Sequence, residues 1–264
     1  MLKINFIKTD DSNIINEFRK KLYKTFVAPI DSMWQDLYIA SSQAYLIEKD
    51  NKQIGYCCID NNGALLQIFV NAENKYLMQT IIRNLIDSKL ISSASLSSIE
   101  PLSFNACLFH SISMQTNTFC YEYSNRALDD ENSLNVELVT PEFSNAIRSY
   151  YKDHVGFDDT FGYVDNLVSR KELFMALEDD TIIATGECRL SDAQLDYADV
   201  GVSVNTQHRK KGLATKMLQQ MAHKAIKQDR NPICSTTIDN IGSQKAIERA
   251  GFYCSNIIFD INLI

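Results

Sequence analysis

The 264-residue sequence predicts an α/β protein made of two mixed-sheet α/β domains in tandem. Segments in which apolar residues alternate, typical of strands, are interspersed with segments in which they recur every three or four positions, typical of helices. The order of these segments is similar in the two halves of the chain, and a repeated order indicates a repeated fold. A polar stretch at 124–133 separates the halves, so we expect domains at residues 1–128 and 129–264.

The second half has the clearer pattern. Thr140-Pro141-Glu142 combines a capping residue with a first-turn proline and predicts a helix start. An amphipathic helix is expected where apolar residues recur at four-residue spacing, namely at Leu213, Met217, Met221 and Ala225. A shorter helix is expected at 243–250. Strands are expected at 135–139, 172–177, 181–189, 197–204, 232–237 and 252–263.

The first half shows a similar order with one difference. The strand at 65–71 lies 134 positions before the segment that ends at Asn205, but no glycine follows it in 72–77. This half is therefore expected to be a degenerate copy that buries apolar surface and lacks a ligand loop. The other elements expected in it are strands at 43–48, 53–59 and 94–99 and helices at 77–90 and near 102–114.

Composition narrows the class of protein. The formal net charge is −7, which argues against a nucleic-acid partner. The N-terminus has too short an apolar run for a signal peptide, and no segment is long and apolar enough for a membrane span, so a cytoplasmic protein is expected. The seven cysteines form no C-x-x-C pair and no cluster with histidine, so no metal site is expected and the thiols are expected to be reduced.

Charge is unevenly distributed along the chain. Between Asp153 and Asp199 there are twelve acids and three bases, and a basic run at 209–211 follows. An acidic face beside a basic cluster suits a pair of ligands, in which a cationic ligand binds the acidic face and an anionic ligand binds the basic cluster. The alternative is that the acidic run is only a solvated face, which is the commoner meaning of such a run.

The basic run stands at an unusual place for cations. Its residues, with those that follow, are Arg209, Lys210, Lys211, Gly212, Leu213, Ala214 and Thr215, at the expected start of a helix. Each cation there is disfavoured by about 0.3–1 kcal/mol because the helix dipole is positive at that end. A bound anion would reverse this preference, and Gly212 would let phosphate oxygens approach the backbone. The alternative is a solvated basic turn.

These segments resemble a known family. Val200-Gly-Val-Ser-Val204 followed by Arg209-x-x-Gly212-x-Ala214 is similar to the strand and pyrophosphate loop of the GNAT superfamily of N-acetyltransferases. Asn240-x-x-Ser243 with Gly251-Phe252 resembles the second cofactor segment of that family. The resemblance covers residues 135 to 264 well and the first half only in outline.

The resemblance implies acetyl-CoA as cosubstrate and assigns residues to it. Val202, Ser203 and Val204 would offer backbone groups to the pantetheine arm, and residues 209–215 would hold the pyrophosphate. Asn240 and Ser243 would contact pantetheine or the adenosine end. For these last two residues the alternative is helix capping, and both roles can coexist.

Two carboxylates are candidates for the general base. Asp199 occupies the place of an acid often found on this strand in the family, and Glu187 on the preceding strand is the rival; Asp199 is alternatively a solvated strand residue. A base is needed because deprotonating a lysine-like amine at pH 7 costs about 4.6 kcal/mol. Many family members carry a tyrosine as general acid where this chain has Ile247, so that acid is missing from its usual place; Tyr253 is nearby in sequence.

The resemblance implies an N-acetyltransferase that moves an acetyl group from acetyl-CoA to an amine of a small molecule or peptide. The amine is expected to attack directly in a ternary complex, with one cofactor per chain in a monomer or homodimer. Two other functions stay open: an acyl-CoA-binding sensor without turnover, and an aminoacyl transferase that uses charged tRNA. The negative charge weighs against the second of these.

Overall fold

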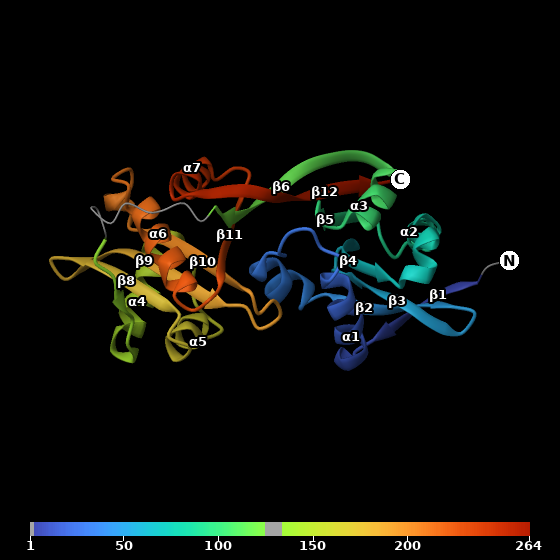
Figure 1. The fold of residues 1–264 in the computed structure, drawn as a ribbon, viewed down its shortest axis with the longest axis horizontal. Helices are drawn as coiled ribbons and strands as arrows, with labels where there is room; N and C mark the ends of the chain where they lie inside the picture. The colour runs from blue at the N-terminus through green and yellow to red at the C-terminus, as the bar shows by residue number, and fades with distance from the viewer. Residues whose placement is uncertain (1–2, 125–133) are drawn as a thin grey trace. The chain divides into compact units, whose positions relative to one another are not determined.

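The computed structural model describes residues 3–124 and 134–264, and these form two compact α/β units (Figure 1). Unit 1 comprises Met1–Phe119 and Asn256–Ile264, and unit 2 comprises Cys120–Ser255. Two strands, β6 (Ser111–Tyr123) and β12 (Phe252–Leu263), contribute residues to both units. Most of the boundary expected at 124–133 lies outside the described residues, and the division at 128 and 129 stays a prediction.

Unit 1 is a mixed sheet with helices packed on it. The strands run in the order β1-β2-β3-β4-β5-β12, antiparallel except for the parallel pair β4 and β5. Its own strands are β1 (Ile4–Thr9), β2 (Gln43–Lys49), β3 (Lys52–Ile59), β4 (Ala64–Val70) and β5 (Ser93–Ser97). Its helical segments are α1 (Ser12–Tyr23), η1 (Trp34–Ile39), η2 (Ala72–Leu77), α2 (Met78–Asp87) and α3 (Pro101–Leu108).

The parallel pair of unit 1 is short. Strand β4 pairs with β5 only at Ala64 with Ser93 and at Leu65 with Ala94. The rest of β4 therefore diverges from β5. Helix α2 covers the sheet nearby because one of its faces is apolar and buried, through Met78, Ile81, Ile82 and Leu85.

Two findings differ from the sequence-based expectations for unit 1. No element is expected from the sequence before residue 43, but the structure has β1, α1 and η1 there. Helix α1 begins after Asp11, whose side chain accepts hydrogen bonds from the amides of Asn13 and Ile14. The helix near 102–114 is wrong at its end, because α3 stops at Leu108 and β6 begins at Ser111. The segment from Ser111 alternates and carries β-branched residues, which favour a strand.

Unit 2 repeats the same architecture. Its strands follow the order β12-β6-β11-β10-β9-β8-β7, and β10 and β11 are parallel. The strands confined to it are β7 (Glu137–Leu138), β8 (Leu173–Glu178), β9 (Thr181–Leu190), β10 (Tyr197–Val204) and β11 (Asn231–Thr237). Its helical segments are η4 (Pro141–Phe143), α4 (Ser144–Tyr150), η5 (Tyr151–Val155), α5 (Tyr163–Ser169), η6 (Thr206–His208), α6 (Leu213–Ile226) and α7 (Ile241–Arg249).

The expected amphipathic helix of unit 2 is confirmed as α6, which packs on β9 and β10. Met217, Met221 and Ala225 of its apolar stripe are fully buried. The close approach of α6 to the sheet depends on Gly186 of β9, because a Cβ there would lie 2.5 Å from Met217 Sδ and 2.9 Å from Met221 Cγ. The sheet and this glycine together fix where the N-terminus of α6 lies.

None of the helices in the described part of the chain is long and apolar enough to cross a membrane. Within the same residues, no group of histidine, cysteine and acidic side chains is placed to hold a metal ion.

Replacing Gly186 by alanine is expected to lower the free energy of unfolding by about 1–3 kcal/mol, because the added methyl group overpacks the buried contact with Met217. Urea titration followed by circular dichroism measures the change. Gly242→Ala in α7 is the control, since only Asn240 Oδ1 lies near the new methyl group, at 3.8 Å, and alanine favours a helix. Equal stability of the two variants would contradict the packing argument.

Candidate active site

The site is organised around the end of a parallel strand pair. Strand β10 pairs with β11 only from Tyr197 to Asp199, whereas it pairs with β9 from Ala198 to Val204. Beyond Asp199, one edge of β10 therefore has no neighbouring strand. An extended ligand can bind the backbone groups of such an edge as an added strand would. Val202, Ser203 and Val204, the residues assigned to the pantetheine arm, all lie in this segment.

The loop after β10 leads into the start of α6. Lys210 and Gly212 have left-handed backbone conformations, with φ of +63° and +80°, and a side chain is strained at such a φ. Gly212 is the N-cap of α6, no side chain caps this helix start, and its first turn contains no acid. A helix start of this kind presents backbone N–H donors to solvent and binds anions.

The three cations of this loop have different positions. Arg209 is fixed, because its Nη2 donates to the carbonyl of His154 at 2.8 Å and its Nε to the carbonyl of Val204 at 3.3 Å. Lys210 and Lys211 are exposed, and neither forms an ion pair with the described residues. The two lysines are thus available to a phosphate, whereas Arg209 links the loop to η5.

The second cofactor segment lies at the start of α7, which packs against α6. Asn240 is the N-cap, and its Oδ1 accepts from the amide of Ser243 at 3.1 Å, so the capping alternative is confirmed for this pair. The Thr215 hydroxyl donates to the carbonyl of Ala246 at 3.4 Å and links the first turn of α6 to α7. The structure thus brings the two helices that carry the predicted cofactor residues together.

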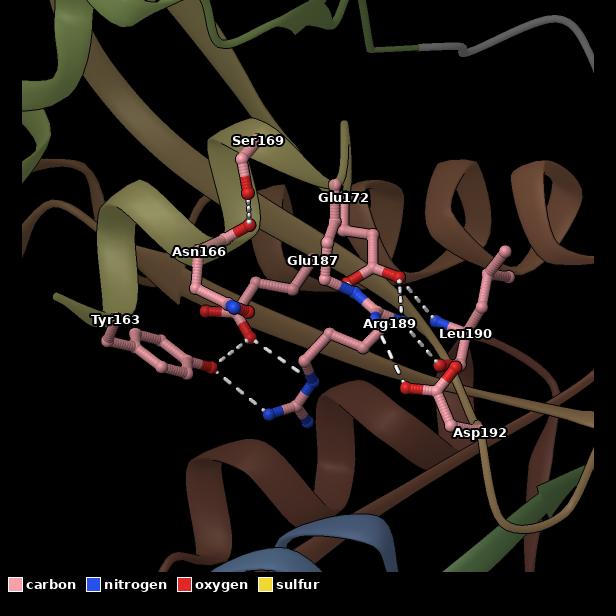
Figure 2. A network of polar contacts seen from close by, with 9 residues as sticks. Tyr163, Asn166, Ser169, Glu172, Glu187, Arg189, Leu190 and Asp192 are labelled. Atoms are coloured by element: carbon pink, nitrogen blue, oxygen red, sulfur yellow. Dashed lines mark hydrogen bonds and ion pairs between the residues drawn. The ribbon is translucent and has the colours of Figure 1, made fainter.

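Glu187 is the centre of a polar network on β9 (Figure 2). Its carboxylate accepts from Tyr151 Oη at 3.0 Å and from Tyr163 Oη at 2.7 Å. Burial and the Glu187 charge raise the pKa of both tyrosines above their usual value, so they remain protonated donors at neutral pH. The Glu187 side chain is 15 % exposed and keeps some access to solvent.

Arg189 lies between two carboxylates. Its Nη2 donates to Asp199 Oδ1, its Nε lies 3.5 Å from Glu187 Oε2, and its Nη1 donates to Tyr163 at 3.1 Å. Burial alone would lower the pKa of Arg189, but the charges of Asp199 and Glu187 together raise it above the ordinary value. The guanidinium therefore stays charged with a compensating carboxylate on each side.

Asp199 occupies a different environment from Glu187. It is only 2 % exposed and paired with Arg189, so the alternative of a solvated strand residue is wrong. Sequence reasoning did not identify this partner, nor Tyr151 and Tyr163. A signal for Arg189 exists, because residues two apart on a strand share a face, and Glu187 and Arg189 are two apart. The tyrosines come from other elements and leave no such signal.

Glu187 also lies close to the unpaired part of β10. It is opposite Gly201 in the β9–β10 ladder, and a Cβ on Gly201 would lie 3.3 Å from Glu187 Oε2. Gly201 is two residues beyond the last pairing of β10 with β11. The absence of a side chain at Gly201 thus makes room for the Glu187 carboxylate beside the segment of β10 that has no strand on its other edge. Ile247 is buried in the core, which places no hydroxyl at the position of the usual family acid.

The acidic run before β10 is partly neutralised within unit 2. Arg148 pairs with Asp159 and Asp165, and Arg170 pairs with Glu172 and Asp192. The run is therefore not a uniform solvated face.

Comparison with known proteins agrees with this geometry. Residues 11–124 match the family described as "Acetyltransferase (GNAT) domain" and residues 136–252 match "Acetyltransferase (GNAT) family". These matches define an acyltransferase fold in both halves. The chain belongs to the GNAT acetyltransferases, a family that typically uses acyl-CoA and acts on an acceptor substrate, and it carries two GNAT domains in tandem.

Solved structures support the same assignment. An acetyltransferase of the GNAT family from Colwellia psychrerythraea is 26 % identical with a TM-score of 0.93, covering 99 % of this chain and 100 % of that one. A GCN5-related N-acetyltransferase from Sphaerobacter thermophilus has 13 % identity and a TM-score of 0.66, covering 98 % and 95 %. A tandem GNAT protein from the clavulanic acid biosynthesis pathway has 12 % identity and a TM-score of 0.61, covering 99 % and 98 %. The last two show the fold alone. No protein with a curated description matches the sequence.

The Arg189–Asp199 pair is expected to stabilise the fold of unit 2. Asp199→Ala leaves a largely buried guanidinium with one carboxylate fewer and should lower the free energy of unfolding by about 3–5 kcal/mol. With Arg189→Met in addition, the loss should be smaller than the sum of the two single losses by about 1–3 kcal/mol. Chemical denaturation of the parent, both single variants and the double variant measures this cycle. Additive losses would show that the two side chains are not coupled.

Proposed function

We propose that unit 2 transfers an acetyl group from acetyl-CoA to a primary amine of a small molecule or peptide. The observation that carries the proposal is the position of three features around one strand, β10. Its edge is free of β11 after Asp199, its C-terminal end leads to the uncapped start of α6, and the Glu187 carboxylate lies beside Gly201. One strand would thus hold the cofactor arm between a phosphate site and a base.

Each part of the cofactor has a partner in this arrangement. The pantetheine arm would bind the backbone of Val202, Ser203 and Val204. The pyrophosphate would accept from the amides of Leu213, Ala214 and Thr215 and pair with Lys210 and Lys211. Gly212 leaves the approach open, because nothing lies within 4 Å of the position a Cβ would take. Unit 1 has the six-residue segment η2 with the acidic Glu73 in place of this loop, so one cofactor per chain is expected.

Glu187 is the better candidate for the general base. Asp199 already compensates the charge of Arg189 and is almost fully buried, whereas Glu187 keeps some exposure and lies beside Gly201, in the part of β10 that β11 does not pair with. Glu187 would take a proton from the attacking ammonium, directly or through one water. Tyr151 and Tyr163 would act as positioning residues that hold its carboxylate.

The reaction would then proceed in one ternary complex. The amine nitrogen forms a bond to the thioester carbonyl carbon, the carbon–sulfur bond breaks, and coenzyme A leaves as the thiolate. The nitrogen loses two protons: one passes from the ammonium to Glu187 before the attack, and the second leaves the tetrahedral adduct for solvent. The leaving thiolate, with an ordinary thiol pKa of about 8.5, takes a proton from solvent, since Ile247 has none to give.

The buried Ile247 also favours a second function, an acyl-CoA-binding sensor without turnover. A panel of amines with release of CoA thiol as the signal separates the two. Steady thiol release with any amine supports the enzyme, and cofactor binding without release supports the sensor. Aminoacyl transfer from charged tRNA is less consistent with a net charge of −7.

The phosphate site is tested at its glycine. Gly212→Asp places a carboxylate where the pyrophosphate would bind and is expected to abolish acetyl-CoA binding, whereas the parent is expected to bind one equivalent in isothermal titration calorimetry. Gly212→Asn is the matched control, because it has the same shape and tolerates the left-handed backbone but adds no charge. It should retain weakened binding. Parent-like affinity of Gly212→Asp, or two equivalents bound to the parent, would contradict the proposed site.

The base is tested by pH dependence. Glu187→Gln keeps the hydrogen-bonding shape but cannot accept a proton, so kcat should fall by about 10²–10⁴ with little change in acetyl-CoA affinity. The loss should shrink as pH rises, because the amine then loses its proton unaided. Glu178→Gln, at an exposed acid one strand away, is the control with the same charge change. Activity of Glu187→Gln equal to that control at every pH would remove Glu187 from the mechanism.

A further inference from the structure

Unit 1 contains a cavity of about 160 Å³ at the divergence of its own parallel strands. The end of β4 forms one wall through Ile68, Phe69 and Val70, three to five residues beyond the last pairing of β4 with β5. The rest of the lining comes from the C-terminal end of α1, from η2 and Met78, and from the first turn of α3. An apolar cavity of about 150 Å³ is large enough to hold benzene. The volume therefore suits a ligand of about six or seven non-hydrogen atoms.

Glu100 is the buried ionisable side chain of this mostly apolar lining, in which Lys75 is exposed. Glu100, which precedes α3, is 6 % exposed, and its carboxylate has a single hydrogen bond within the described chain, from Ser103 Oγ at 3.3 Å. Burial raises the pKa of Glu100 to about 8. A carboxyl group this deeply buried ordinarily forms an ion pair or accepts several hydrogen bonds.

The groups around Glu100 do not compensate its charge. The titratable groups that interact electrostatically with Glu100 are the tyrosines Tyr23 and Tyr56 and the thiols Cys58 and Cys107. All four are neutral near pH 7. Lys75 lines the same cavity, but it is exposed and forms no ion pair with Glu100 among the described residues. The ionised form of Glu100 therefore lacks a cationic partner among the residues that the structure describes.

We propose that this cavity binds a compact organic cation, a primary alkylammonium with an apolar body of about six carbon atoms. The ammonium group donates to the Glu100 carboxylate and to Ser103 Oγ, and the apolar body packs against Phe69, Val70 and Met78. An anion such as a pyrophosphate fits this cavity less well. The acid Glu100 repels it, and Pro101 in the first turn of α3 has no N–H to donate.

Binding of a cation requires the ionised form of Glu100, which gives the proposal a sharp test. Below pH 8 each binding event releases one proton to solvent, so affinity should rise about tenfold per unit from pH 6 towards 8 and then level off. Isothermal titration calorimetry of the full chain with cyclohexylammonium, in two buffers of different ionisation enthalpy, measures both affinity and proton release. Cyclohexanol, of the same size but uncharged, should bind at least tenfold more weakly at pH 8.5.

Variants separate the carboxylate from the cavity. Glu100→Gln should lose the preference for the cation and the pH dependence, and Thr25→Phe at the cavity lining should weaken both probes alike. Glu73→Gln removes an exposed acid of unit 1 outside the lining and should bind as the parent does. No binding of cyclohexylammonium to the folded parent, equal binding of cyclohexanol, or undiminished binding to Glu100→Gln would overturn the proposal. Tighter binding of inorganic phosphate than of the amine would do so as well.

Discussion

Strand β10 keeps β9 as a neighbour along its length but loses β11 after Asp199, and the site of unit 2 depends on this divergence. A backbone edge without a partner strand is costly to bury, because its N–H and C=O groups need hydrogen bonds. A ligand with amide groups can supply them. The end of β10 leads through a short loop to the start of α6, so one strand connects the proposed site of the cofactor arm with the proposed phosphate site.

The charges beside this divergence are arranged so that only one acid is accessible. Removing a guanidinium from water is unfavourable unless a carboxylate compensates it, and breaking a buried pair is more destabilising than never forming it. Asp199 provides that compensation for Arg189 from β10, in a nearly closed position. Glu187 also lies near the Arg189 guanidinium, but two tyrosines hold its carboxylate in a more exposed position. Two acids on neighbouring strands thus have different environments, and different environments lead to different roles.

The two units have the same strand divergence and different chemistry within it. In unit 2 the loop after the strand has left-handed backbone at Lys210 and Gly212, and α6 begins without an acid in its first turn. In unit 1, β4 passes directly into η2. A cavity lined in part by the buried Glu100 lies where β4 and β5 diverge. The site proposed in the first arrangement takes an anion, and the site proposed in the second takes a cation. On this proposal, a duplicated fold carries two ligand sites of opposite preference without a change in topology.

The sequence by itself determined the tandem α/β fold, most strands and helices, and the glycine loop before α6, because these depend on local periodicity and on conformations that few residues adopt. It also determined that unit 1 lacks that loop. Only the tertiary structure decided which acid is buried and which is accessible. The tyrosine partners of Glu187 come from η5 and α5, outside its own strand, and Asp199 meets Arg189 only because β9 and β10 pair. The same holds for Glu100, which forms no ion pair with the described residues because of how α1, β4 and α3 pack around one cavity. Burial and pairing are properties of the packed chain, and no local pattern of residues carries them.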